Sequence, residues 1–179
     1  MKKSTRRTSF IAVLGLCLSF IGFVGGSAAA TADWSYVSVA CVPDDTSTTP
    51  TRYDATTPGL IQFQGTATGD LWFWCNVLSP LDTYGENPTW NGMFVTFKDS
   101  NANGFVRVDL IRKRKDNGGY AINATFTSSD GVGVREGSVP IPAFNFVTYA
   151  YFVRIQLHRD TTSGDPQFHI VSLKEMGPD

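Results

Sequence analysis

The stretch Leu71-Trp72-Phe73-Trp74-Cys75-Asn76-Val77 decides the fold class, because its side chains alternate with a period of two. In an extended strand the odd-numbered residues of this stretch point to one face and the even-numbered residues to the other. We expect the odd face to lie in the core, and its residues are Leu71, Phe73, Cys75 and Val77.

The residues just before this strand show the same alternation. Residues 60–65 read LIQFQG, and residues 66–70 between the two runs read TATGD, with the small residues and glycine typical of a hairpin loop. We therefore interpret residues 60–77 as one β-hairpin.

Alternating segments recur along the rest of the chain, at 34–41, 93–98, 105–113, 120–127, 147–158 and 167–173. Turn residues separate them, as at 116–119 (DNGG), and no stretch has a sustained helical period. The core positions that this predicts include Val37, Val39 and Cys41 in the first segment, and Ile122, Ala124 and Phe126 in the fourth. The connection 128–144 has room for a short strand at 133–136. About eight strands predict an all-β chain, a single antiparallel β-sandwich of jelly-roll or Greek-key topology.

The amino terminus has the pattern of a secretory signal peptide. Four basic residues among the first seven precede the apolar run 10–24, and small residues follow at 25–30. We expect cleavage before Thr31, with cleavage before Asp33 as the alternative. The alternative, a retained membrane anchor, needs about 20 apolar residues, and the run 10–24 is shorter than that. Twin-arginine and lipoprotein signals fit less well, because Phe10 lies one position late and Leu16 is bulky beside Cys17.

These features divide the chain into a signal peptide, residues 1–30, and one secreted β-sandwich domain, residues 31–179, extracellular or periplasmic. Removing residues 1–30 takes away four basic and no acidic side chains, which leaves 11 basic against 16 acidic and a net charge of −5. This charge disfavours nucleic acid as a partner. We expect no membrane span after cleavage.

The domain retains two cysteines, Cys41 and Cys75. In an exported protein such a pair is expected to form one disulfide, and closing a loop of about 35 residues stabilises a fold by roughly 3 to 4 kcal/mol. A metal pair or a redox couple would call for further ligands or a C-x-x-C spacing, which this sequence lacks.

Three segments carry a family resemblance: Cys41-Val42-Pro43-Asp44, residues 65–77, and the ending 151–155 with 168–173. In these segments the chain resembles small, uncharacterised secreted bacterial proteins with a two-cysteine, β-rich mature chain. The resemblance spans most of residues 31–179. It implies export and a single domain, and it assigns no site residues.

Trp72 and Trp74 give the first candidate site, because they lie on the strand face away from the predicted core. Aromatic rings on a sheet face can hold sugar rings, and Gln62 and Gln64 would supply hydrogen bonds. Phe94, Phe152 and the loop residue Trp90 would join them if their strands are neighbours. The alternative is that a loop or a second sheet buries this face. We predict a non-catalytic binding or cell-surface module, with a glycan as the candidate ligand.

Residues 99–104, DSNANG, match the first half of a calcium loop, in which oxygen ligands recur at every second position. The candidate ligands are Asp99, Asn101 and Asn103. The position that should hold a bidentate carboxylate is Leu110 instead. The alternative is a hairpin turn, which prefers the same residue types. No other cofactor is expected.

The two histidines and a basic run suggest other functions. His158 and His169, the two histidines of the chain, would serve a metal-dependent hydrolase if adjacent strands carry them, with Asp160 or Asp165 beside them. No catalytic motif accompanies them, so we predict no enzyme and no catalytic residues. The basic run 112–115 is interpreted as a solvated hairpin tip, with contact to an anionic surface or an acidic polysaccharide as the alternative. Self-association through an edge strand, as a structural extracellular subunit, is the remaining class.

Overall fold

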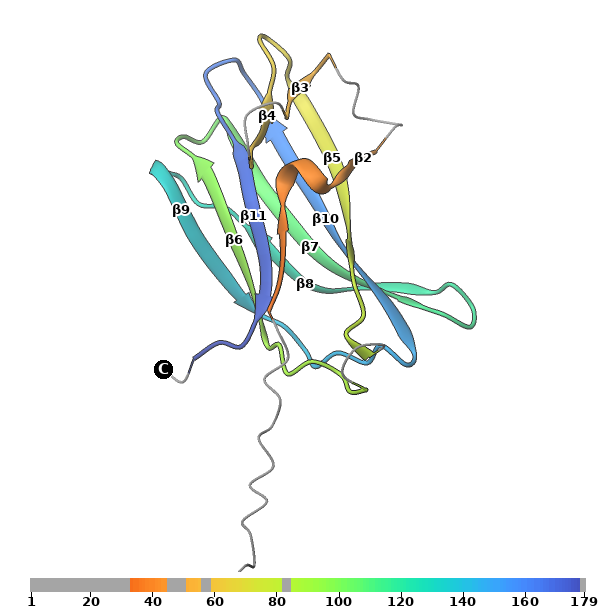
Figure 1. Ribbon diagram of the computed structural model, residues 1–179. Coiled ribbons are helices and arrows are strands. Elements are labelled where there is room, and N and C mark those ends of the chain that lie inside the picture. Colours follow the sequence, from red (N-terminus) through yellow and green to blue (C-terminus); the bar gives the residue numbers. More distant parts are fainter. Residues whose placement is uncertain (1–32, 45–50, 56–58, 82–84, 178–179) are drawn as a thin grey trace, which may run out of the picture.

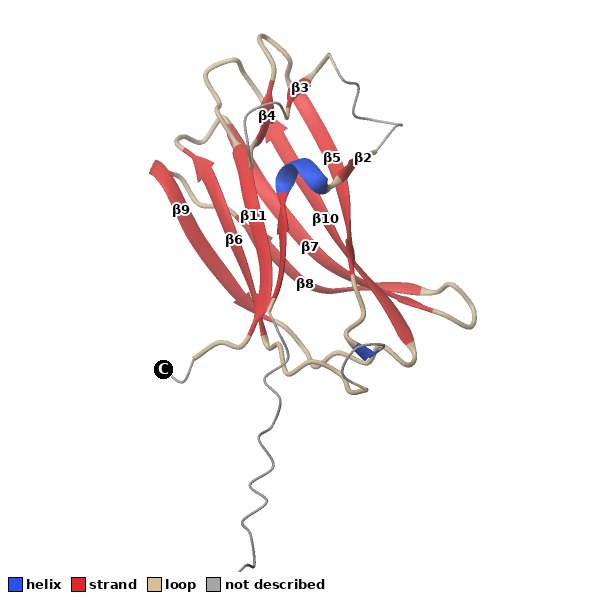
Figure 2. Cartoon of the chain, viewed as in Figure 1, coloured by secondary structure: helices blue, strands red, loops and turns tan. Residues whose placement is uncertain are grey.

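The computed structural model describes residues 33–44, 51–55, 59–81 and 85–177, and the signal peptide predicted for residues 1–30 lies outside them. Figures 1 and 2 show the arrangement of the strands and of the short 3₁₀ helix η1. In chain order they are β1 (Trp34–Val37), η1 (Ser38–Ala40), β2 (Val42–Pro43), β3 (Tyr53–Asp54), β4 (Ile61–Phe63), β5 (Gly69–Val77), β6 (Gly92–Asp99), β7 (Gly104–Arg114), β8 (Tyr120–Thr127), β9 (Gly131–Pro140), β10 (Tyr149–Arg159) and β11 (Gln167–Lys174). The described part of the chain contains no helix with the length and hydrophobicity of a membrane-spanning segment.

Two antiparallel sheets face each other (Figure 1). Sheet A has the order β3-β4-β11-β6-β9, with β1 also paired to β11, and sheet B has the order β2-β5-β10-β7-β8. Taken alone, the eight strands from β4 to β11 have the order first-eighth-third-sixth in sheet A and second-seventh-fourth-fifth in sheet B. This is a jelly roll. The predicted antiparallel β-sandwich is therefore confirmed.

Alternation along the strands fills the space between the sheets with apolar side chains. Leu71, Phe73 and Cys75 on β5 are at most 1% exposed, and Val77 is also buried. Phe73 lies opposite Ile155 of β10, which is fully buried as well. Burial of a side chain of this size stabilises a fold by about 1.5 to 3 kcal/mol. The predicted core face of residues 71–77 is confirmed.

The predicted hairpin at residues 60–77 is wrong, because β4 and β5 belong to different sheets. β4 pairs with β3 and β11, and the linker crosses to sheet B through Gly65 and Gly69, whose φ angles are 52° and 90°. Glycine adopts such left-handed angles without a steric penalty. Phe63 therefore enters the core from sheet A and Phe73 enters it from sheet B, so the two apolar faces meet across the sandwich.

The first predicted strand, residues 34–41, is broken after Val37. β1 pairs with β11 in sheet A, η1 then turns the chain, and β2 pairs with β5 in sheet B. The predicted core positions of Val37 and Val39 are wrong, because these residues are 44% and 43% exposed. β1 points Trp34 and Tyr36 inward, which turns Val37 outward, and Val39 lies in η1.

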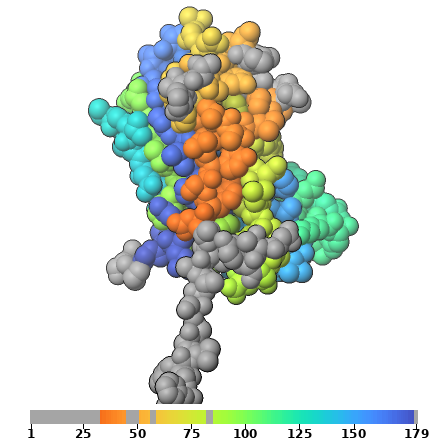
Figure 3. Space-filling view, viewed as in Figure 1, coloured from red at the N-terminus to blue at the C-terminus, as the bar shows by residue number. Residues whose placement is uncertain are grey.

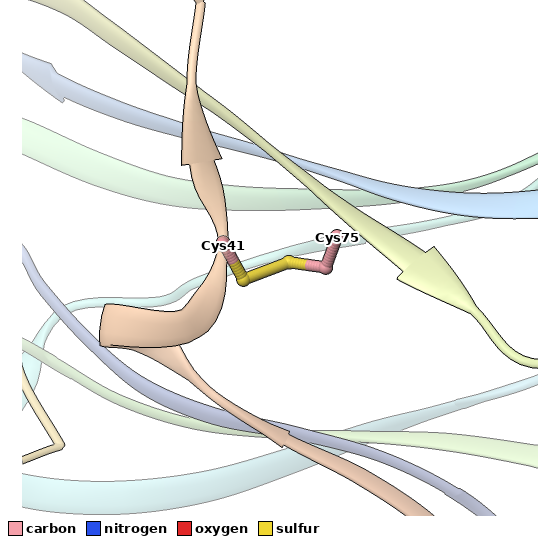
Figure 4. Close-up of a disulfide and its surroundings, with 2 residues drawn as sticks. All are labelled: Cys41 and Cys75. Atoms are coloured by element: carbon pink, nitrogen blue, oxygen red, sulfur yellow. A yellow bond between two sulfur atoms is a disulfide. The ribbon is translucent and has the colours of Figure 1, made fainter.

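Cys41 follows η1 and still points inward. Its Sγ is bonded to that of Cys75 on β5, so the predicted disulfide is confirmed (Figure 4). The Cα atoms are 4.6 Å apart and the residues are 34 positions apart in sequence. The bond links the segment between η1 and β2 to strand β5 of sheet B.

Strands β8 and β9 also differ from expectation. A register shift between Leu110 and Ile111 leaves Ile122 45% exposed, so its predicted core position is wrong, while Phe126 is buried as predicted. β9 covers ten residues, where a strand of four was expected. Three of its inward positions are glycines, which carry no apolar signal. A Cβ on one of them, Gly137, would lie 2.4 Å from the ring of Phe126.

Candidate functional site

The outward side chains of sheet B form rows across its strands, and the register of the strands sets each row. The central row runs from Trp74 on β5 through Arg154 on β10 and Asp109 on β7 to Thr125 on β8. The neighbouring rows are Asn76, Phe152 and Ile111 on one side and Trp72, Gln156 and Arg107 on the other. Trp72 and Trp74 are half-buried on this face.

A groove of about 580 Å³ lies on this face. Its lining residues are Trp74, Asn76, Ile111, Lys113, Gly118, Tyr120, Phe152 and Arg154. They come from four segments of the chain, namely β5, β7, the β7–β8 hairpin and β10, which only the folded sheet brings together.

The β7–β8 hairpin forms the outer part of the groove, and it projects from one side of the molecule (Figures 1 and 3). Gly118 has a φ of 71°, and the amide of Gly119 donates to Oδ1 of Asn117, so the predicted turn at 116–119 is confirmed. Lys113 and Tyr120 are partners across the hairpin, and Tyr120 is 77% exposed. The hairpin thus presents an aromatic ring and an amine beside the groove.

The floor of the groove between its two cationic side chains is apolar. Phe152 lies opposite Ile111, which is only 5% exposed although it points away from the sandwich core. Lys113 pairs with Ala150, and Arg154 lies four residues further along β10. At about 3.3 Å per residue, the backbone positions of Lys113 and Arg154 are therefore offset by about 13 Å along the strand direction, one on either side of this floor.

Arg154 contacts both tryptophans of the face. Its guanidinium carbon lies 4.9 Å from the ring centroid of Trp72 and 5.7 Å from that of Trp74. Its Nη2 donates to Oδ2 of Asp109 at 2.7 Å. The Nε of Arg154 is buried and has no hydrogen-bonding partner within the described residues. Asp109 and the two tryptophan rings therefore hold the guanidinium in place.

The buried carboxylate of Asp109 holds Arg154 in this position. This carboxylate is 1% exposed and also accepts hydrogen bonds from Nε of Arg107 at 3.0 Å and from the hydroxyl of Thr125 at 2.7 Å. Burial alone would raise the pKa of the Asp109 carboxyl, but the hydrogen bonds from Arg154, Thr125 and Arg107 outweigh it and lower the pKa below its ordinary value. Asp109 is therefore ionised at neutral pH.

His158 lies on the same outer face, in the row of Asp70 and Phe105. Its Nδ1 is 2.8 Å from Asp70 and its Nε2 is 2.9 Å from Asp160, while its ring stacks on Phe105. Burial would lower the pKa of His158, but the hydrogen bonds to Asp70 and Asp160 outweigh it and raise the pKa. Both ring nitrogens are engaged with carboxylates.

His169 does not join His158. It lies on β11 in sheet A, whereas His158 lies on β10 in sheet B, so the expectation of adjacent strands is wrong. Burial, with the charge of Lys98 as a smaller cause, lowers the pKa of His169. The described residues contain no group of three or more His, Cys, Asp or Glu side chains placed to hold a metal ion.

The three candidate calcium ligands form hydrogen bonds within the protein, and Asn101 and Asn103 share Ser163 as a partner. Asp99 is 1% exposed and accepts a hydrogen bond from the hydroxyl of Ser128. Asn101 donates to the carbonyl oxygen of Ser163, and Asn103 donates to the hydroxyl of the same serine. The oxygen Oδ1 of Asn101 accepts from the amide of Asn103. Calcium binding at this turn stays a prediction.

The structure does not bring the two glutamines together with the tryptophans. Gln62 lies on β4 in sheet A and bonds to Gln167, while Gln64 is an exposed residue of the linker between the sheets. Of the other aromatic residues, Phe152 joins the groove. Trp90 is buried in the core, and Phe94 lies on sheet A beneath Lys174.

Sequence reasoning did not select Asn76, Lys113, Tyr120 or Arg154 as site residues. Alternation alone places Arg154 and Phe152 on one face of the strand at 147–158. The signal that was missing is strand order, because only the pairing of β10 with both β5 and β7 places Arg154 between Trp74 and Asp109.

The fold and the groove define a class of protein, a jelly-roll β-sandwich with an aromatic and basic groove on one outer face. No protein-family model and no curated protein matches the sequence. One similar solved structure is the CBM36-1 domain of a multidomain xylanase from the hindgut metagenome of Trinervitermes trinervoides. It is 13% identical, the match covers 82% of this chain and 100% of that chain, and the TM-score is 0.46.

Two other solved structures are similar at comparable levels. CsCBM6-3 from Clostridium stercorarium, in complex with cellobiose, is 10% identical, with 86% of this chain and 100% of that chain covered and a TM-score of 0.43. A family two carbohydrate esterase from Cellvibrio japonicus is 11% identical, with a TM-score of 0.40; the match covers 81% of this chain and 34% of the esterase. TM-scores below 0.5 at such identities do not establish a shared function.

Proposed function

We propose that this protein is a non-catalytic module that binds a glycan in the groove on sheet B. The observation that carries the proposal is the presence of three aromatic rings, those of Trp74, Tyr120 and Phe152, in one groove with the polar side chains of Asn76 and Arg154. Sugar rings offer apolar C–H faces and hydroxyl edges, so they suit a surface that combines rings with hydrogen-bonding groups.

The groove is better suited to binding than to catalysis. Its ionisable lining residues are Lys113, Tyr120 and Arg154, and no carboxylate lines it in the described part of the chain. Hydrolysis of a glycosidic bond ordinarily uses two carboxyl groups on either side of that bond. The carboxylate beneath the groove, Asp109, accepts three hydrogen bonds from protein side chains and is 1% exposed.

The cysteines and the amino terminus support a proposal about the compartment. A disulfide between Cys41 and Cys75 fits an oxidising environment. We propose that the signal peptide predicted for residues 1–30 exports the chain, and that the domain works outside the cytoplasm.

Calorimetric titration of the purified protein with a panel of soluble neutral and acidic oligosaccharides tests the proposed function. Tyr120→Ala removes an exposed ring, and we expect about a fivefold loss of affinity, which corresponds to about 1 kcal/mol for one stacking contact. Val132→Ala is the matched control, because Val132 is 94% exposed on β9 of the other sheet. Equal binding by both variants and the unaltered protein would place the ligand elsewhere, and binding of no oligosaccharide in the panel would reject the function.

Self-association is the second candidate, and the edge strand β9 favours it. β9 is the last strand of sheet A, and its outward residues Val132 and Val134 are 94% and 55% exposed. An unpaired strand edge with apolar side chains is a template for pairing with another chain. Sedimentation of the protein over a concentration series tests this candidate, and Val134→Lys should abolish any dimer that uses this edge.

A further inference from the structure

We infer, on the basis of the glycan-binding function proposed above, that the groove selects glycans carrying an acidic sugar. The side chains of permanent charge that line the groove are Lys113 and Arg154, and both are cations. The described lining includes no acidic residue. A carboxylate or sulfate on a sugar would therefore meet attractive charges at both ends of the apolar floor.

The positive charge of the groove contrasts with the charge of the whole domain. Residues 31–179 carry five more acidic than basic side chains. Asp109 beneath the groove has one negative charge against the two positive charges of Arg107 and Arg154. At physiological ionic strength charges are screened over about 8 Å, so a ligand in the groove responds to the cations beside it more than to distant carboxylates.

Both groove cations keep capacity for a ligand. Among the described residues, Lys113 has neither an ion pair nor a hydrogen-bonding partner, whereas its neighbour Arg114 is paired with Asp116 at 2.6 Å. Arg154 uses Nη2 for Asp109, and its side chain is 27% exposed, so the accessible part of the guanidinium can meet a ligand in the groove. Cationic donors of this kind bind carboxylates and sulfates by charge-assisted hydrogen bonds.

The spacing of the cations favours a sparsely charged glycan over a dense polyanion. The two strand positions are about 13 Å apart, and the floor between them is formed by Phe152 and Ile111. The middle of a bound ligand thus lies over apolar side chains, while its charged substituent reaches Lys113 or Arg154. A nucleic acid would bring many phosphates to a domain whose net charge is −5.

Two matched pairs of ligands test the inference, each differing in charge alone or nearly so. One pair is trigalacturonate and its methyl ester, and the other is xylotetraose with a glucuronic acid branch and the methyl ester of that branched oligosaccharide. We expect at least one acidic member to bind about tenfold more tightly than its neutral partner, with an affinity that falls as sodium chloride is raised.

Two neighbouring variants separate contact from general charge. Lys113→Gln and Arg114→Gln each remove one positive charge, but the side chains point to opposite faces of β7 and only Lys113 lines the groove. We expect Lys113→Gln to remove most of the preference for the acidic ligand and Arg114→Gln to preserve it. Both residues are exposed, so both variants should fold.

The outcomes distinguish this inference from the proposed function. Equal binding of acidic and neutral members overturns the acidic selectivity and leaves glycan binding intact. An equal loss in both variants, or equal binding of poly-glutamate or single-stranded RNA, also overturns it, because the groove would then respond to polyanions in general. Binding of no glycan in these pairs or in the wider panel overturns both.

Discussion

Asp109→Asn tests whether the buried carboxylate beneath the groove holds this face of sheet B together. The substitution keeps the size of the side chain and removes its charge. Asp109 accepts three hydrogen bonds, two of them from guanidinium groups, and is 1% exposed. The amide that replaces it would bring donors towards donors, so Arg107 and Arg154 would lose their shared partner.

The expected loss in the free energy of unfolding follows from those contacts. A hydrogen bond to a charged group contributes about 1.5 to 3 kcal/mol, and removing one member of a buried ion pair costs about 3 to 5 kcal/mol. Arg154 and Arg107 are 27% and 38% exposed, so water replaces part of what they lose. We expect the free energy of unfolding to fall by about 2 to 3 kcal/mol and Tm to fall by about 5 to 10 °C.

Urea unfolding followed by circular dichroism measures this change, and Asp116→Asn is the matched control. Asp116 and its partner Arg114 are 58% and 47% exposed, so the control should change the free energy of unfolding by less than about 0.5 kcal/mol. If Asp109→Asn is no more destabilising than Asp116→Asn, the carboxylate does not organise the groove.

The pH dependence gives an independent check. The pKa of Asp109 is lowered in the folded protein, so its contribution is fully present above its unfolded pKa of about 3.8 and is lost as the pH falls through the lower folded value. The difference in stability between the unaltered protein and Asp109→Asn should therefore be constant between pH 5 and pH 8 and shrink in strong acid. A difference that grows towards low pH would contradict the assignment.

Three further predictions concern the histidines, a glycine and the disulfide. Titration followed by NMR should give His158 a pKa above its ordinary value of about 6.5 and His169 a pKa below it, and the opposite order would refute the contacts described for them. Because the folded pKa of His158 is raised, its contribution to stability is present below pH 6.5 and lost as the pH rises through the folded value, so the destabilisation caused by His158→Gln should fade at alkaline pH. Gly137→Ala should cost about 1 to 3 kcal/mol, because the new Cβ would lie 2.4 Å from the ring of Phe126; Gly177→Ala, with no atom within 4 Å, is its control in the same thermal melts. Replacing Cys41 and Cys75 together by alanine should cost at least about 3 to 4 kcal/mol, measured by urea unfolding, and a loss below 1 kcal/mol would show that the 34-residue link constrains little.

The sequence by itself determined the fold class, the core face of residues 71–77 and the disulfide. The reason is that these depend on local periodicity and on residue type. Leu71, Phe73 and Cys75 had to point to one side of any strand formed there, and two cysteines in a chain with a predicted export signal have few other uses.

The tertiary structure decided which strands are neighbours, and with them the candidate site. Alternation reports which face of a strand is buried but not which strand lies beside it. The run at 60–65 therefore suggested a hairpin with β5, whereas β4 lies in the other sheet. For the same reason Gln62 was grouped with the tryptophans, although β10 supplies their real neighbours, Arg154 and Phe152. Long-range pairing, which depends on the packing of the whole sandwich, places these side chains together.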